Sequence, residues 1–381
     1  MAKPTLPIAH AAYLHVPFCR HRCGYCNFTV VAGRDELAER YLAAVERELQ
    51  ALETPRPVDT LFVGGGTPTH LARGHLARLL SLAHQWFPLT ADGEWSVEAN
   101  PVDVDAKKLG ALASAGVTRL SLGVQSFRDA KLRLLERDHS GEQAREAVAA
   151  ARSAVATVAV DLIFATPGET LDDWSRDLDA AIALEPDHIS TYGLTIEKGT
   201  SYWTRRRTGD LAEVDEETQR AMYESAIERL TAAGYEHYEV SNFARPGHRC
   251  RHNEAYWRGD EFFAAGPGAS RYLAGRRETN HRSTTTYIAR VLAGHSPVAE
   301  VDELSPRERA CERLVFALRR IDGVRRGWFA TATGFMVDEL ARTAIERYVQ
   351  LGLVDDDGET IRLTREGLLV SDALWPQLLA P

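Results

Sequence analysis

Three cysteines stand within eight residues near the start of the chain, and their spacing is the strongest chemical signal in the sequence. Cys19, Cys23 and Cys26 form a C-x3-C-x2-C motif directly after a short apolar segment. Three thiolates this close together can bind three irons of a [4Fe–4S] cubane and leave the fourth iron open to a chelating cofactor. The basic residues at positions 20–22 would favour the thiolate forms and offset the charge of such a cluster.

A structural zinc site is the main alternative for these cysteines. Structural zinc usually takes four ligands, often as two separated pairs. The sequence has no second C-x2-C pair, and its distant candidates are Cys250 and a histidine. A disulfide scaffold is disfavoured as well, because five cysteines are an odd number and the chain is as long as 381 residues. The spacing therefore favours the iron–sulfur cluster.

Short apolar segments alternate with amphipathic helical segments through the first half of the chain. The clearest helix covers Glu36–Leu52, where apolar residues recur at helical spacing and Asp35 is expected to be the N-cap. Repeated strand–helix units predict a parallel sheet, since each parallel neighbour needs a crossover connection. Six such units predict an α/β fold built on an incomplete (β/α)6 barrel. The strands are expected at Ala12–Val16, Thr60–Val63, Trp95–Ala99, Arg119–Gly123, Val158–Phe164 and His188–Leu194.

Polar residues and glycines stand in or just after four of these strands. They are Gly64–Thr67, Glu98, Ser121 and Asp161. In barrels of this kind the carboxyl-terminal ends of the strands carry the functional site. We therefore expect one ligand to lie across these strand ends, beside the cysteine motif.

The pattern changes beyond residue 213, and the sequence predicts three parts: 1–213, 214–300 and 301–381. The middle part begins with a helix at Thr218–Ala233, followed by one strand at Tyr235–Phe243 and an irregular aromatic-rich stretch. The last part has two predicted helices, a hairpin at Leu353–Leu363 around Asp357-Gly358, and a final helix. This order indicates an α+β, winged-helix-like C-terminal module.

The cysteine motif, with an aromatic residue before its last cysteine, resembles the radical S-adenosylmethionine (SAM) superfamily. Several further blocks resemble the oxygen-independent coproporphyrinogen III oxidase group, and the resemblance covers nearly the whole chain. It implies that Cys19, Cys23 and Cys26 hold a [4Fe–4S] cluster whose open iron binds SAM. The blocks are Tyr13–Cys19, Gly64–Thr69, Glu98–Pro101, Gly123–Phe127 and Asp161–Gly168.

The same resemblance implies roles for nine further residues. Tyr13, Tyr25, Gly65, Gly66, Thr67 and Glu98 match positions that contact the first SAM, and Gln125, Arg137 and Asp161 match positions associated with a second SAM. Glycine suits such a loop because the backbone must approach the ligand closely. Two structural alternatives stay open: Arg137 as a surface ion pair on a helix, and Asp161 as a buried hydrogen-bond acceptor.

A second motif separates the subfamilies. His252, Asn253, Tyr256 and Trp257 form H-N-x-x-Y-W, which is similar to the signature of the HemW family of radical SAM haem chaperones. The resemblance implies a haem contact, since imidazole ligates iron and the two aromatic rings offer flat apolar faces. Cys250 is an alternative axial ligand. The structural alternative is a core cluster in which His252 only bonds a neighbour.

Two departures argue against porphyrinogen decarboxylation. Phe28 stands where coproporphyrinogen dehydrogenases carry a further cysteine, and 18 residues precede the first cysteine, fewer than in those enzymes. The resemblance therefore implies a haem chaperone that binds haem, cluster and SAM and delivers haem to apo-haemoproteins, including respiratory ones. SAM cleavage and gating without cleavage are both compatible with it. The alternatives are coproporphyrinogen III dehydrogenase and a zinc-stabilised interaction protein.

Composition limits the partners. The formal net charge of −9 argues against broad nucleic-acid binding. No window approaches the roughly 18 apolar residues of a membrane span, and the N-terminal segment lacks the pattern of a signal peptide. The sequence thus predicts a cytoplasmic protein without nucleic-acid partners or a membrane span, for which a homodimer stays open.

Overall fold

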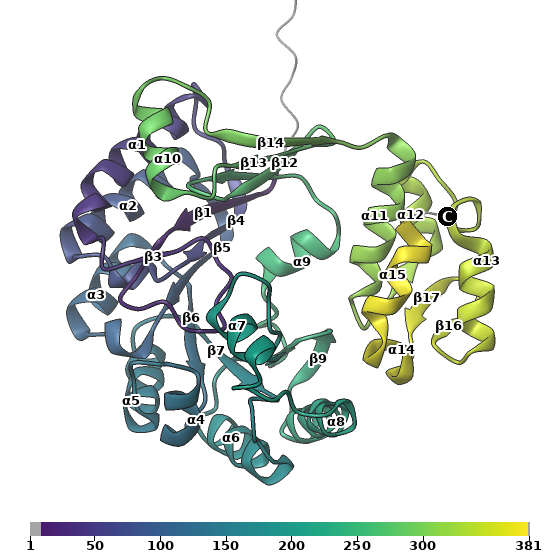
Figure 1. Cartoon of the computed structure of the whole chain (residues 1–381). Helices are drawn as coiled ribbons and strands as arrows, with labels where there is room; N and C mark the ends of the chain where they lie inside the picture. The colour runs from purple at the N-terminus through teal and green to yellow at the C-terminus, as the bar shows by residue number, and fades with distance from the viewer. Residues whose placement is uncertain (1–8, 380–381) are drawn as a thin grey trace, which may run out of the picture.

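The computed structural model describes residues 9–379, and within them the chain is organised around one twelve-stranded mixed sheet. Residues 1–8, which belong to the segment tested above for a signal peptide, lie outside the described residues. Figure 1 shows the sheet with helices along one side and the C-terminal elements as a separate group beside it. The strand order is β14-β13-β12-β11-β1-β4-β5-β6-β7-β8-β10-β9.

Six parallel strands form the centre of the sheet, and they confirm the six predicted ones. Each pairs in parallel with the next along the chain, as strand–helix units require. Side chains alternate between two faces. The strands are β1 (Ala11–Val16), β4 (Val58–Gly65), β5 (Leu89–Ala99), β6 (Arg119–Gln125), β7 (Thr157–Phe164) and β8 (His188–Gly193).

One face of these strands packs against the crossover helices and forms the main hydrophobic core. Leu14, Val63, Val97 and Val160 are fully buried there. We call the opposite face, which carries Tyr13 and the polar residues, the inner face. The helices are α1 (Ala38–Gln50), α2 (Arg73–Trp86), α3 (Ala106–Ala115), α4 (Asp129–Leu134), α5 (Gly141–Arg152), α6 (Leu171–Ala183), α7 (Ser201–Thr208) and α8 (Glu216–Ala232).

The predicted N-cap of the first helix is wrong. A short 3-10 turn, Asp35–Leu37, precedes α1, and Leu37 takes the cap position without a side-chain hydrogen bond. The Asp35 carboxylate instead pairs with His70, at 3.0 Å from Nε2. The Asp35 side chain therefore bonds a residue distant in sequence, whereas local capping rules predicted a bond to the helix backbone.

The middle part of the chain extends the sheet at both edges. The single strand expected at 235–243 is wrong: the chain turns at residues 240–241 and forms an antiparallel hairpin beside β8. At the other edge, β11 pairs in parallel with β1, and three antiparallel strands follow it. The elements are β9 (Glu236–Glu239), β10 (Asn242–Ala244), α9 (Arg251–Trp257), β11 (Phe262–Ala265), β12 (Ser270–Leu273), β13 (Arg276–Asn280), α10 (Thr284–Leu292) and β14 (Val298–Glu303).

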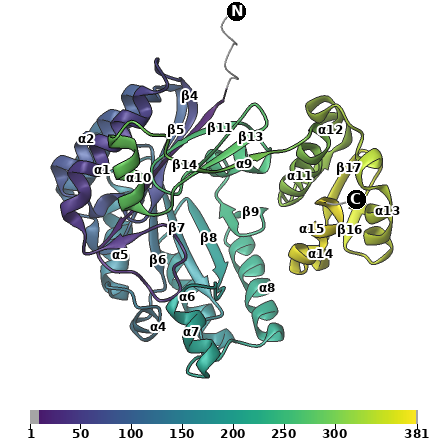
Figure 2. The same cartoon turned by 45° about the horizontal axis from the view of Figure 1, so that its top comes forward.

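The C-terminal elements form an α+β module with a hydrophobic core of their own, set beside the sheet in both views (Figures 1 and 2). Three helices, rather than two, precede the predicted hairpin. No helix within residues 9–379 combines the length and the apolar character needed to cross a membrane. The elements are α11 (Pro306–Leu318), β15 (Val324–Arg325), α12 (Arg326–Thr333), α13 (Val337–Gln350), β16 (Val354–Asp356), β17 (Thr360–Leu363), α14 (Arg365–Leu369) and α15 (Ser371–Leu379).

Candidate functional site

The three cysteines line a cavity at the carboxyl-terminal ends of the parallel strands. They lie on the loop after β1, which includes the short strands β2 (Phe18–Cys19) and β3 (Val31–Ala32). The ends of β4, β5 and β6, the middle of β7 and the segment after α4 supply further parts of the wall. We call this the cysteine cavity. Its other lining residues include Tyr25, Gly65, Gly66, Thr67, Glu98, Asn100, Ser121, Gly123, Gln125, Arg137 and Asp161.

Arg137 ties the cysteine loop to the strand ends. Its guanidinium donates to the Cys23 sulfur at 3.6 Å, to Asn100 Oδ1 at 2.5 Å and to the Gly123 carbonyl at 2.7 Å. It is therefore no surface ion pair. Asn100 in turn donates to Thr67 Oγ1 at 3.0 Å, and Thr67 lies 3.5 Å from the Cys19 sulfur. Sequence reasoning gave Asn100 no role, although it stands in the Glu98–Pro101 block.

The thiols of this cavity suit a cluster of several irons. Burial raises the pKa of Cys19 to about 12 and also raises that of Cys26, so these two thiols are protonated at neutral pH when no metal is bound. Bound metal deprotonates a coordinating thiol. Within residues 9–379 no three His, Cys, Asp or Glu side chains converge on one metal ion. A cubane does not need such convergence, because each thiolate binds a different iron.

Two carboxylates of the inner face lie in the same cavity. Glu98 accepts from the Gly65 amide at 2.8 Å, and Ser121 donates to Asp161 at 3.2 Å. Removal from water raises the pKa of Glu98 to about 7 and that of Asp161 to about 6. Asp161 is thus a hydrogen-bond acceptor and a cavity-lining residue at once. Nearby, the buried Gln125 side-chain oxygen has no hydrogen-bond partner among residues 9–379, and the backbone of Gln125 has a φ of 65°.

Glycine is required at positions 65 and 66 for a different physical reason from the expected one, which was close approach of the backbone to a ligand. A Cβ on Gly65 would stand 2.2 Å from the His15 ring, and its φ of 107° favours glycine. A Cβ on Gly66 would stand 2.6 Å from the Phe18 carbonyl oxygen. Contact with the β1 segment therefore demands both glycines before any ligand is considered.

Tyr13 and Tyr25, which were both expected to contact the first SAM, line different cavities. Tyr25 lines the cysteine cavity, with its ring centroid 6.2 Å from that of Tyr202. Tyr13 lines a neighbouring cavity, and its hydroxyl bonds His15 Nδ1 at 3.0 Å. The other His15 nitrogen bonds the Thr29 carbonyl at 2.7 Å. The structure thus brings Tyr25 to the cysteines and directs the Tyr13 hydroxyl elsewhere.

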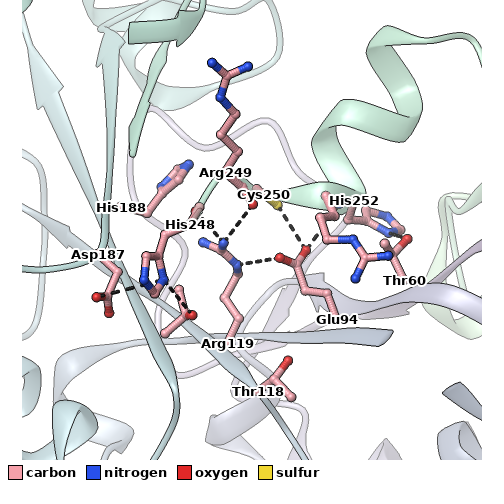
Figure 3. A network of polar contacts seen from close by, with 12 residues as sticks. Thr60, Glu94, Thr118, Arg119, Asp187, His188, His248, Arg249, Cys250 and His252 are labelled. Carbon is pink, nitrogen blue, oxygen red and sulfur yellow. Dashed lines mark hydrogen bonds and ion pairs between the residues drawn. The ribbon is translucent and has the colours of Figure 1, made fainter. Parts of the chain in front are cut away.

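The opposite end of the inner face is closed by a network of charged and polar groups (Figure 3). Buried Arg119 pairs with buried Glu94 at 3.0 Å and donates to the carbonyls of His248 and Arg249 at 2.6 and 3.1 Å. The amide of His252 donates to Glu94 at 3.2 Å. This network fastens the segment before α9 across the amino-terminal ends of the strands.

His252 lies inside this packing. Its side chain is 1% exposed, with Nδ1 3.0 Å from Thr60 Oγ1 and Nε2 2.9 Å from the Tyr256 hydroxyl. Burial lowers the pKa of His252 to about 3, so the ring is neutral. Both nitrogens are used, as in the core-cluster alternative. Cys250 is also buried, and burial raises the pKa of its thiol to about 12, which disfavours a thiolate.

The aromatic residues of the second motif do reach cavity walls. Tyr256 and Trp257 line a cavity of ≈490 Å³ between the sheet edge and α11, and Tyr256 also lines the cavity of Tyr13. Asn253 is half-buried on α9. The motif therefore divides into a buried histidine and two cavity-lining rings.

Comparisons with known proteins show the family to which this chain belongs. A Radical SAM superfamily model matches residues 13–181, and a HemN C-terminal domain model matches residues 304–370. The chain is 39% identical over 376 residues to "Heme chaperone HemW" of Mycobacterium tuberculosis, covering 96% of this chain and 94% of that one. The chain belongs to the HemW family of radical SAM proteins. Membership implies an iron–sulfur cluster and SAM as family cofactors.

Further relatives match over most of their length. The Bacillus subtilis "Heme chaperone HemW" is 32% identical, with 97% of this chain and 99% of the relative covered. A mitochondrial "Radical S-adenosyl methionine domain-containing protein 1" from Bos taurus is 35% identical, with 97% and 87% covered. The structure of coproporphyrinogen III oxidase (HemN) from Escherichia coli superposes with a TM-score of 0.86 at 23% identity, covering 99% of this chain and 91% of that one. That last likeness shows a shared fold.

Proposed function

We propose that this protein is a cytoplasmic haem chaperone that binds haem, a [4Fe–4S] cluster and SAM and transfers haem to apo-haemoproteins, respiratory ones among them. One observation carries the proposal: three cysteine thiols, a glycine loop and two carboxylates line a single cavity in a member of the HemW family. The relatives named as haem chaperones match this chain over nearly its whole length.

In this proposal Cys19, Cys23 and Cys26 hold the cluster, which would supply an open iron for SAM and an electron for its cleavage. The Arg137 guanidinium beside Cys23 offsets negative charge on the cluster. Gly65, Gly66, Thr67 and Glu98 offer backbone and side-chain groups to SAM, together with Tyr25, while Tyr13 supports the wall next to it. Gln125, Arg137 and Asp161 line the same cavity and are the groups proposed for a second SAM.

For haem, the proposal gives different tasks to the members of the second motif. Tyr256 lines two neighbouring cavities and would contact the porphyrin, while Trp257 lines one of these cavities. His252, with Asn253 beside it on α9, would act by positioning Tyr256 through the bond from Nε2. We therefore expect His252→Ala to weaken haem binding without abolishing it.

The test begins with anaerobic reconstitution of the full chain with iron and sulfide. Haem is then titrated and followed by absorbance, while SAM, reductant and coproporphyrinogen III are supplied in a parallel sample that is assayed for 5′-deoxyadenosine and for porphyrinogen products. Saturable, stoichiometric haem binding without porphyrinogen consumption, followed by haem transfer to an apo-haemoprotein, supports the proposal. Decarboxylation of the porphyrinogen would overturn it and make the chain a dehydrogenase despite Phe28.

A matched pair of variants checks the cluster. Cys23→Ala should remove the iron–sulfur absorbance, because a thiolate ligand is lost. Cys311→Ala is the control, since that thiol is buried in the core of the C-terminal module. Equal iron content in the two variants would contradict the assignment of the ligands.

A further inference from the structure

A cavity of ≈770 Å³ lies between the cysteine loop and the antiparallel edge of the sheet. This volume is within the range of small-molecule sites, roughly 300–1,000 Å³. Aromatic side chains dominate part of its wall: Tyr13 from β1, Tyr256 from α9, Phe262 from β11 and Phe28 from the cysteine loop. We call it the edge cavity. Several aromatic faces around one space suit a flat apolar ligand.

Phe28 connects the edge cavity with the cysteine cavity. It lines both of them, and it is 66% exposed, although it stands only two residues after Cys26. Within residues 9–379 the Phe28 ring belongs to none of the hydrophobic core clusters. Phe28 therefore offers an apolar ring to both cavities.

The edge cavity also contains a histidine with a free ring. His281 follows β13 and is half-buried, and its backbone amide donates to the Pro297 carbonyl at 2.9 Å. Its imidazole has no hydrogen bond or ion pair within residues 9–379. His15, which lines the same cavity, uses one ring nitrogen on Tyr13 and the other on Thr29. His281 is therefore the cavity histidine whose ring is available to a ligand.

A cation stands next to this histidine. Arg282 is exposed, lines the cavity and donates to the Asn27 carbonyl at 2.8 Å and to Thr29 Oγ1 at 3.3 Å. Guanidinium groups bind carboxylates through strong charge-assisted hydrogen bonds. One carboxylate, Glu300, also lines the cavity, on β14. A free ring nitrogen, flat apolar walls and a guanidinium are together the groups that a metalloporphyrin with acidic side chains requires.

We propose that haem binds in the edge cavity, with His281 as an axial ligand of the iron, Phe28 and Tyr256 against the porphyrin faces and Arg282 near a propionate. This inference rests on the proposed function and names its haem site. It separates the roles of two histidines: His281 contacts the iron, and His252 positions Tyr256. It also puts the haem beside the cysteine loop, since Phe28 belongs to both cavities.

The test uses the full, cluster-reconstituted chain and titrates haem into the parent, His281→Ala, His281→Met and His295→Ala. His295 is an exposed histidine near the same edge of the sheet and serves as the matched control. We expect His281→Ala to weaken haem binding roughly tenfold or more and to shift the Soret maximum, with added imidazole restoring the parent spectrum. His281→Met, which offers a thioether, should bind haem with a Soret band different from both.

The possible results are distinct. Parent-like affinity and spectrum in His281→Ala, with iron–sulfur absorbance retained, would overturn the edge-cavity assignment and leave the proposed function intact. Loss of binding in His252→Ala without imidazole rescue in His281→Ala would overturn it as well. A parent chain that binds no haem would overturn the proposed function itself, and this inference with it.

Discussion

Two glutamates stand on the inner face of strand β5, four residues apart, and they have opposite surroundings. Glu94, midway along β5 and nearer its amino-terminal end than Glu98, pairs with Arg119 and accepts a hydrogen bond from the His252 amide. Glu98, at the carboxyl-terminal end, receives one backbone amide and faces a cavity that also holds Asp161. The strand is the same and the residue type is the same. The difference is whether the protein itself supplies the opposite charge.

Charged side chains at one end of the parallel strands hold the structure together, whereas those at the other end line a cavity. At the amino-terminal end, buried charges compensate one another and hold the segment before α9 in place (Figure 3). At the carboxyl-terminal end, carboxylates of like charge stay incompletely compensated, which costs stability in the ligand-free chain. Groups kept at such a cost mark the end of the sheet where a ligand is expected.

The largest change in the free energy of unfolding should come from removing one partner of the buried Arg119–Glu94 ion pair. Arg119→Met leaves Glu94 buried without its partner and leaves two backbone carbonyls without a donor. We expect a loss of about 3–5 kcal/mol in the free energy of unfolding. Urea titration measures it. The double variant Arg119→Met/Glu94→Leu should recover part of the loss, and additive single effects would contradict the proposed coupling.

The second effect should have the opposite sign and depend on pH. The pKa of Glu98, about 7, lies above its ordinary value of 4.5, so the folded chain keeps a proton that the unfolded chain loses between these values. This contribution to stability is fully present below about pH 4.5 and is lost as the pH rises through 7. We therefore expect Glu98→Gln to stabilise the ligand-free chain at pH 8, by on the order of 2–3 kcal/mol, and hardly at pH 4.5.

The control for this second effect is Glu94→Gln, on the same strand. It should destabilise the chain at pH 8, because it removes the charge that Arg119 requires. If both glutamine variants changed the free energy of unfolding with the same sign at pH 8, the contrast between the two ends of β5 would be lost.

A smaller effect is expected at His252. Thr60→Val removes the hydroxyl that bonds the buried imidazole at Nδ1 and keeps a similar shape. We expect a loss of about 1–3 kcal/mol, because a buried ring nitrogen is left unsatisfied. Thr90→Val is the matched control, since its hydroxyl bonds Asp59 at the surface. An unchanged urea midpoint for Thr60→Val would mean that the His252 ring finds another partner.

The smallest effect should come from the surface contacts of the C-terminal module. Arg220 on α8 pairs with Glu366 on α14 at 2.7 Å, and both side chains are about half exposed. Exposed ion pairs contribute little. Arg220→Ala should therefore leave the urea midpoint within experimental error, at low and at high salt. A clear, salt-sensitive shift would show that this pair helps to hold the module against the sheet.

Local patterns in the sequence predicted a large part of this protein. Spacing identified the three cysteines, and hydrophobic periodicity located the six parallel strands. Because parallel strands end at one edge, the same patterns also brought Glu98 and Asp161 together with the cysteines. The predictions of the strands and of the shared cavity are confirmed, because each depends on residues close in sequence or on a rule of parallel topology.

Tertiary structure decided what local patterns do not encode. Asp35 bonds His70 instead of capping a helix, and Tyr13 lines the neighbouring cavity. Within residues 9–379 the His281 ring has no hydrogen-bond partner, whereas the His252 ring has two. Each outcome depends on partners tens to hundreds of residues away, such as Thr60 for His252. The sequence determined which side chains could do chemistry. The packing of distant segments decided which of them are paired inside the protein and which are left for a ligand, because that depends on where the chain places the opposing charge or hydrogen-bonding group.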